Sequence, residues 1–177
     1  MNSFAHQGVV FLSFVATLVA AAPVAAQTPS EGRAAGVSAA AQSPDARRVA
    51  ETIRAVFAAA ERMDLGALDT LYAGDSLTVF ESAGINRGWR DYRDHHLAPE
   101  LRAFKNFRYR PFEVEARVSG DLAWAVFRYA LSADMAERKV DAVGRGTMIL
   151  ERRGSGWVVR HSHTASRARR PGDPPMP

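Results

Sequence analysis

The spacing of apolar residues changes near residue 105, and this change constrains the fold more than any other feature of the sequence. Between residues 49 and 63, apolar side chains recur every three or four positions, which is typical of one face of an α-helix. After residue 105 they recur at every second position, which is typical of β-strands. Helices followed by antiparallel strands predict an α+β fold, with the helices packed on one face of a sheet.

Local signals place the elements within this scheme. Ser43 and Pro44 predict a helix start, because a hydroxyl can cap the first turn and proline is favoured at its first position. A second helix is expected after Asp64, and a third from Trp89, interrupted at Pro99. Strands are expected at 77–81, 107–118, 122–133, 139–152 and 157–164, with turns at 84–88, 120–121 and 152–156.

Composition excludes several classes of protein. The chain has 177 residues, enough for one domain with tails, and contains no cysteine. Disulfides, thiolate nucleophiles and cysteine-ligated metals are therefore excluded. Lys and Arg number 23 against 19 Asp and Glu, a net charge of +4. Part of this excess comes from three arginines after residue 166, so no nucleic-acid partner is predicted.

The first 26 residues are typical of a secretory signal peptide. They carry no Asp, Glu, Lys or Arg, and residues 8–22 are an apolar run too short to span a membrane as a helix of about 20 residues. Small residues precede Gln27, so cleavage is expected after Ala26. The predicted location is the periplasm or outside the cell, with no membrane association after cleavage. The alternative is an uncleaved anchor.

The rest of the chain divides by composition. Residues 27–43 are rich in Ala, Gly, Ser and Pro, and are interpreted as a flexible linker. Residues 44–166 form the predicted domain. Residues 167–177 are rich in Arg and Pro and have almost no apolar side chain to bury, so they are expected to be disordered.

Several short strings resemble the NTF2-like superfamily, in particular its SnoaL-like branch and the association (hub) domain of calcium/calmodulin-dependent kinase. They are Thr147, Arg152, Arg153, Trp157, His161, His163 and Ser166, then Ala123, Trp124, Arg128 and Tyr129, and finally Gly88, Trp89, Tyr92 and His96. The resemblance implies a cone in which N-terminal helices pack on a curved antiparallel sheet and enclose a pocket. The superfamily includes isomerases, cyclases, dehydratases, carriers and oligomerisation modules, so the fold does not imply one function. The aspartates that ketosteroid isomerases and SnoaL-type cyclases use have no counterpart that the sequence identifies.

The histidines are the first candidates for chemistry. His161 and His163 share strand parity with Trp157, so both imidazoles are expected on the core side, facing the pocket. His96 lies four residues after Tyr92 on the same helical stripe, whereas His95 is expected to face solvent. Three interpretations stay open: a three-histidine zinc or copper site, hydrogen-bonded pocket residues, and general acid–base catalysis. We predict no bound metal and no cofactor.

Charged residues within apolar strands are the second candidates. Glu81 ends an apolar strand and can act as a base in a closed cavity, orient a histidine, or face water. Arg128 needs a partner, which is expected to be Glu81, Glu151 or an anionic ligand. The predicted catalytic residues are therefore His161, His163 and Glu81, and the predicted ligand-binding residues are Trp89, Tyr92, His96, Trp124, Arg128 and His163. Gly144 and Gly146 precede a strand, so they do not form a dinucleotide-binding fingerprint.

These observations predict an exported small-molecule-binding domain. The alternatives are an isomerase, cyclase or hydrolase that uses a pocket His or Glu as general acid–base, and an oligomerisation module. Residues 122–133 are apolar at both parities, whereas a helix layer can cover only one face of a sheet. Because large apolar patches are rarely left in water, we predict a homodimer through the outer sheet face.

Overall fold

A computed structural model describes residues 43–177. The predicted signal peptide, residues 1–26, and linker residues 27–42 lie outside the described residues. The helical elements are α1 (Pro44–Glu61), α2 (Leu65–Leu71), the 3-10 turn η1 (Gly74–Ser76), α3 (Trp89–Tyr92), the π-helical turn η2 (Arg93–Leu97) and α4 (Ala98–Ala103). The strands are β1 (Thr78–Glu81), β2 (Gly84–Arg87), β3 (Lys105–Ser119), β4 (Leu122–Asp134), β5 (Lys139–Arg153) and β6 (Gly156–Ala168). None of the helices in this part of the chain has the length and apolarity needed to cross a membrane.

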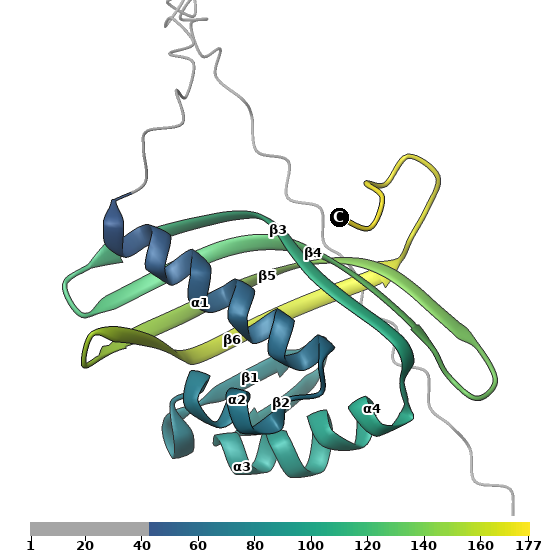
Figure 1. The fold of residues 1–177 in the computed structure, drawn as a ribbon, viewed down its shortest axis with the longest axis horizontal. Coiled ribbons are helices and arrows are strands. Elements are labelled where there is room, and N and C mark those ends of the chain that lie inside the picture. Colours follow the sequence, from purple (N-terminus) through teal and green to yellow (C-terminus); the bar gives the residue numbers. More distant parts are fainter. Residues whose placement is uncertain (1–42) are drawn as a thin grey trace, which may run out of the picture. The chain divides into compact units, whose positions relative to one another are not determined.

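The six strands form one sheet in the order β2-β1-β6-β5-β4-β3. The helices lie along one face, with α1 crossing the long strands (Figure 1). The predicted α+β fold is thus confirmed, but the sheet is mixed, because β1 joins the β6 edge in parallel orientation. Residues 84–87, which were expected in a turn, form the short strand β2 paired with β1. This edge strand is short and mostly exposed, and its one large apolar side chain, Ile85, gives no alternation that could indicate a strand.

Both predicted helix starts are built as their sequence signals indicate. The Ser43 hydroxyl accepts a hydrogen bond from the backbone N–H of Ala46 at 3.2 Å. Asp64 Oδ1 accepts one from the N–H of Ala67 at 2.9 Å. These side chains satisfy backbone donors that have no partner within the first turn of a helix.

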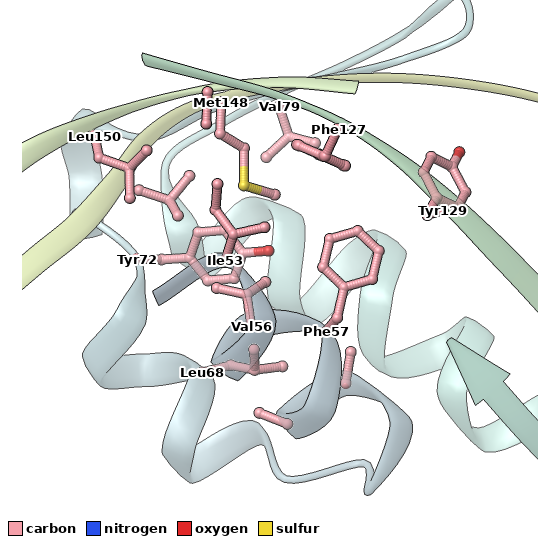
Figure 2. Close-up of a cluster of buried hydrophobic side chains, with 14 of the residues drawn as sticks. Ile53, Val56, Phe57, Leu68, Tyr72, Val79, Phe127, Tyr129, Met148 and Leu150 are labelled. Carbon is pink, nitrogen blue, oxygen red and sulfur yellow. The ribbon is translucent and has the colours of Figure 1, made fainter. Parts of the chain in front are cut away.

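The core lies between α1 and the inner face of the sheet, which we define as the face covered by the helices. Figure 2 shows Ile53, Val56 and Phe57 of α1 opposite side chains from the strands. Ile53 and Leu150 are completely buried. Burial of such side chains contributes roughly 1.5–3 kcal/mol each relative to exposure, so this layer fixes α1 on the sheet.

Two glycines of β5 make room for aromatic rings of β4. A Cβ atom on Gly144 would lie 2.2 Å from the Tyr129 ring, and one on Gly146 would lie 2.5 Å from the Phe127 ring. Contacts this short are not tolerated, so any side chain at these positions would displace a ring. The two glycines therefore allow the Phe127 and Tyr129 rings to lean across β5.

A β-bulge in β6 reverses which side chains face the core. Val159 pairs with Leu150, but His161 pairs with the preceding residue of β5, Ile149, so Arg160 is an extra residue. A bulge of this kind shifts the alternation of side chains between the two faces. Ser162 and Thr164 therefore face inward and are about 5% exposed. The prediction that His161 and His163 point into the core-side pocket is wrong for this reason.

The segment after Ala168 contains neither helix nor strand among its described residues. Its Asp173 forms an ion pair with Arg167 at 2.7 Å. Arg169 forms another with Asp141 of β5, also at 2.7 Å.

Candidate functional site

Glu81 lies at the end of β1, where the inner face of the sheet meets two adjoining cavities. The smaller one, which we call the inner cavity, has a volume of about 30 Å³, and the larger one, which we call the outer cavity, has a volume of about 240 Å³. The inner cavity is lined by Val56, Phe57, Ala60, Tyr72, Val79, Glu81, Tyr92, Leu97, Tyr109, Met148, Ser162 and Thr164. The outer cavity is lined by Glu81, Ser82, His96, Glu100, Tyr129, Thr164, Ala165 and Ser166. Glu81 is thus accessible from both.

His96 faces Glu81 from the helical layer. Its Nε2 lies 3.2 Å from Glu81 Oε2 and 3.6 Å from Glu100 Oε1. The imidazole belongs to η2, where the N–H of Ala98 bonds to the carbonyl of Arg93, five residues earlier. Pro99 follows immediately, and its missing N–H group removes one regular helical bond at this point. Wide turns of this kind are frequent at functional sites.

Burial dominates the electrostatics of Glu81. Its side chain is one-third exposed, but the Oε2 atom is fully enclosed and accepts no hydrogen bond. Desolvation raises the pKa of Glu81, and the charge of Glu100 adds to that rise. His96 and a hydrogen bond from Thr164 lower the pKa but do not cancel the effect of burial. The result is a carboxylate that is more basic than an exposed one.

Two buried tyrosines, Tyr72 and Tyr92, and the partly buried Tyr109 share the inner cavity with Glu81. Burial first, and then the charge of Glu81, raises the pKa values of Tyr72 and Tyr92. Tyr109 behaves similarly, with burial and Tyr129 as the larger causes of its raised pKa. These phenols therefore keep their protons and can donate hydrogen bonds inside the cavity.

Trp89 is a structural residue that packs against Tyr72, outside the two cavities. Its indole Nε1–H donates to Asp69 Oδ1 at 2.6 Å. The ring also stacks on Tyr72, with centroids 4.6 Å apart. Trp89 is therefore in contact with a cavity residue but does not line either cavity itself.

The other predicted site residues lie on the outer face, which is the face opposite the helices. Trp124 is 48% exposed there. Arg128 pairs with Glu113 at 3.1 Å, and not with Glu81 or Glu151 as expected. The structure therefore does not bring Trp124, Arg128 or His163 together with Glu81 and His96.

On the outer face, His161 and His163 flank the ring of Phe80, with centroids 5.1 and 6.1 Å away. Thr78 Oγ1 lies 2.7 Å from His161 Nδ1. Because His96 lies on the inner side, the three histidines cannot converge on one metal ion. Within residues 43–177, no group of three or more His, Asp or Glu side chains is placed to hold a metal.

A larger depression, about 390 Å³, lies mainly on the outer face. Its carboxylates, Glu113 and Glu115, are exposed, and Glu113 is neutralised by Arg128. The smaller site around Glu81 has the more unusual chemistry, because it holds an enclosed carboxylate oxygen.

Sequence reasoning missed Glu100, Tyr109, Tyr129, Ser162 and Thr164 as site residues. One signal was available, because glycines two residues apart in a strand indicate a close approach of neighbouring groups. Gly144 indicates the close approach of the Tyr129 ring, and Gly146 indicates that of the Phe127 ring. No comparable signal indicated the bulge that turns Ser162 and Thr164 inward.

Comparison with known proteins agrees with this architecture. A Streptomyces avermitilis protein described as a candidate dehydratase of the NTF2-like family has a TM-score of 0.63 at 16% identity, with 71% of this chain and 97% of that chain covered. An NTF2-like superfamily protein from Salmonella enterica serovar Typhimurium has a TM-score of 0.63 at 17% identity, with 72% and 95% covered. A candidate ketosteroid isomerase from Shewanella frigidimarina has a TM-score of 0.58 at 18% identity, with 64% and 91% covered.

These likenesses define an NTF2-like fold. Within that class, a model of the SnoaL-like domain matches residues 49–167, and the chain belongs to the SnoaL-like family. Comparison with curated protein sequences found no match.

Proposed function

We propose that the domain binds a small molecule and transfers a proton to or from it, as a lyase or isomerase does, with Glu81 as the base. The observation that carries this proposal is the enclosed Glu81 Oε2 atom, which accepts no hydrogen bond and lies 3.2 Å from His96 Nε2. Evolved proteins rarely leave a buried carboxylate oxygen unsatisfied without a use for it. A desolvated carboxylate is an effective general base.

The chemistry of the cavities supports a particular class of substrate. In the outer cavity, Glu81 can accept a proton from carbon, while the phenol of Tyr129 donates a hydrogen bond to an oxygen on which negative charge develops. The described residues that line the two cavities include two carboxylates but neither Arg nor Lys. An uncharged molecule fits this lining better than an anion. The fold relatives described as a candidate dehydratase and a candidate ketosteroid isomerase are compatible with such a reaction.

The test uses 5-nitrobenzisoxazole, an uncharged probe that loses a proton from carbon while its N–O bond breaks to give a coloured phenolate. We expect the chain from residue 27 onward to accelerate this reaction. Glu81→Gln should lower kcat/KM by about 10²–10⁴-fold, the usual contribution of a general base. The rate should rise with pH through the raised pKa of Glu81, because only the ionised carboxylate accepts the proton.

Glu113→Gln is the matched control, because it removes an exposed carboxylate from the outer face. It should leave kcat/KM unchanged. The proposal is overturned if Glu81→Gln retains wild-type kcat/KM, or if the wild-type chain is no faster than the buffer alone.

A second proposal concerns self-association, and it is favoured by one surface observation. Six large apolar residues are exposed in the described part of the chain, and five of them lie on the outer face. Four of these five are neighbours on β4 and β5 and form what we call the outer apolar patch, namely Leu122, Trp124, Val126 and Ile149, whereas Ile85 lies apart on the edge strand β2. We propose that a second copy of this chain covers the patch in a two-fold homodimer.

Charge supports a second copy as the occupant. Glu113 and Glu115 lie on β3 at one side of the patch, whereas Arg145 lies on β5. In a two-fold interface, the acidic side of one copy can face the basic side of the other copy. A surface that carries both signs of charge can therefore complement itself.

Light scattering at micromolar concentration should give twice the mass of the processed chain. The double variant Trp124→Ser, Ile149→Ser should be monomeric. Met63→Gln, which removes the sixth exposed apolar side chain, is the control and should stay dimeric. A monomeric wild-type chain, or a dimer that survives the double variant, contradicts the proposal.

We also propose that the protein is exported and cleaved after Ala26, on the sequence signals alone. N-terminal sequencing of the protein from a periplasmic extract should begin at Gln27. An intact Met1 in the membrane fraction would contradict export.

A further inference from the structure

Asn86 of β2 connects the candidate site to a carboxylate that lies outside both cavities. Its side-chain Nδ2 is 3.0 Å from Asp91 Oδ2, and its Oδ1 is 2.9 Å from His96 Nδ1. The pairing of β2 with β1 fixes the position of Asn86, because Asn86 lies opposite Val79 in the sheet. The chain of contacts therefore runs from Asp91 through Asn86 to His96.

Asp91 determines the orientation of the Asn86 amide. Its Oδ2 accepts a hydrogen bond from the backbone N–H of Arg87 at 3.1 Å, besides the one from Asn86. These bonds, led by that from Asn86, lower the pKa of Asp91, so its carboxyl is ionised and can only accept. The NH₂ group of Asn86 must then face Asp91, and its carbonyl oxygen must face His96.

The orientation of the amide fixes the proton on the imidazole. A carbonyl oxygen can only accept a hydrogen bond, so His96 Nδ1 must carry the hydrogen that Asn86 Oδ1 accepts. Nε2 is then the nitrogen that can gain and lose a proton. It lies between the enclosed Oε2 of Glu81 and Glu100, whose side chain is 51% exposed.

We propose that His96 Nε2 carries protons between Glu81 and Glu100, and that Asn86 and Asp91 are positioning residues that keep Nδ1 protonated. The proposal rests on the role of Glu81 proposed above. Glu81 takes a proton from the bound molecule at its other oxygen, Oε1, because Oε2 is enclosed. Rotation of the carboxyl group then turns this O–H toward His96, and Nε2 accepts the proton and forms an imidazolium. Nε2–H then gives the same proton to Glu100 Oε1, which releases it to water.

The distances suit this sequence of proton transfers. Transfer requires heavy atoms about 2.6–3.2 Å apart, and such contacts are often long or poorly aligned before the substrate binds. The Glu81 contact is within this range, and the Glu100 contact at 3.6 Å needs only a small movement of a half-exposed side chain. The proton would thus reach solvent on each turnover, which an elimination requires because it releases a proton.

The first test is the tautomer of His96, measured by NMR of the histidine ring nitrogens without any ligand. We expect the wild-type ring to carry its hydrogen on Nδ1. In Asn86→Leu the acceptor is lost, and the hydrogen should shift to Nε2.

His95 is an internal control in the same spectra. Its Nδ1 lies 3.1 Å from Asp91 Oδ1, a contact that Asn86→Leu does not remove, so its tautomer should not change. An Nε2–H tautomer of His96 in the wild-type chain, or no shift in Asn86→Leu, overturns the positioning role. Because no turnover is involved, this outcome is distinct from failure of Glu81 as the base.

The second test concerns the exit through Glu100. Glu100→Gln should slow turnover of 5-nitrobenzisoxazole several-fold in dilute buffer, and added imidazole buffer should restore it by accepting the proton directly. Glu115→Gln, an exposed carboxylate of the outer face, is the control and should behave as wild type. Unchanged turnover in Glu100→Gln, or a loss that buffer does not restore, overturns the exit role.

Discussion

Similar side chains are buried on the inner face of the sheet and exposed on its outer face. Leu150 and Ile149 are neighbours in β5, yet Leu150 is fully buried on the inner face, whereas Ile149 is 39% exposed on the outer face. Carboxylates show the same contrast, since Glu81 is desolvated on the inner face, whereas Glu113 is exposed and paired with Arg128. The difference shows that the helical cover, and not residue type, decides which groups acquire unusual chemistry.

The sharpest test of this contrast is a pair of truncations in one strand. Leu150→Ala should lower the free energy of unfolding by about 2–5 kcal/mol, because it leaves a cavity in a closely packed layer. Ile149→Ala should cost less than about 1 kcal/mol in the monomer, because its side chain is already partly in water. Urea denaturation of both variants measures the difference.

Equal losses from the two truncations would contradict the contrast between the faces. A loss in Ile149→Ala that grows with protein concentration would instead support burial of the outer apolar patch by a second copy, since dimer stability depends on concentration.

Much of the fold follows from the sequence because its signals are local. The cap at Ser43, the cap at Asp64 and the alternation after residue 105 each report the conformation of a few neighbouring residues. The long strands and α1 therefore lie close to where these patterns predict them. Strand β2 was missed because this short, exposed edge strand buries no apolar face.

The site was less predictable because it depends on contacts between distant segments. Strict alternation places His161 and His163 beside Trp157, and only pairing with β5 reveals the extra residue Arg160. Glu81 is a candidate from the sequence because it is a charged residue at the end of an apolar strand. Its contact with His96 depends on a wide helical turn that no sequence period indicates.

A substitution in β5 tests how closely the inner face is packed, and its expected effect is smaller. Gly146→Ala places a Cβ atom 2.5 Å from the Phe127 ring, so the ring must move. We expect a loss of about 1–3 kcal/mol in the free energy of unfolding, which is typical of overpacking. Gly156→Ala is the control, because its nearest contact would be 3.8 Å away, and it should change stability by less than about 0.5 kcal/mol. Thermal unfolding that fails to separate the two variants would show that the inner face has spare room.

The smallest expected effect is a pH dependence of stability, and it should have opposite signs on the two faces. On the outer face, burial first, and His163 second, lowers the pKa of His161 below its ordinary value of 6.5. The unfolded chain then binds more protons than the folded one as the pH falls below 6.5, so wild-type stability decreases there. His161→Asn should remove this part of the decrease, which urea denaturation between pH 8 and pH 5 can measure.

Glu81→Gln provides the comparison from the inner face. Because burial raises the pKa of Glu81 above its ordinary value of 4.5, the folded chain binds more protons than the unfolded one just above that pH. Wild-type stability should therefore fall as the pH rises through this window, and Glu81→Gln should gain relative to wild type in the same direction. If His161→Asn and the wild-type chain lose stability in parallel on acidification, His161 is not desolvated by its neighbours Thr78 and Phe80. The outer face would then be as open around its histidines as it is around Glu113.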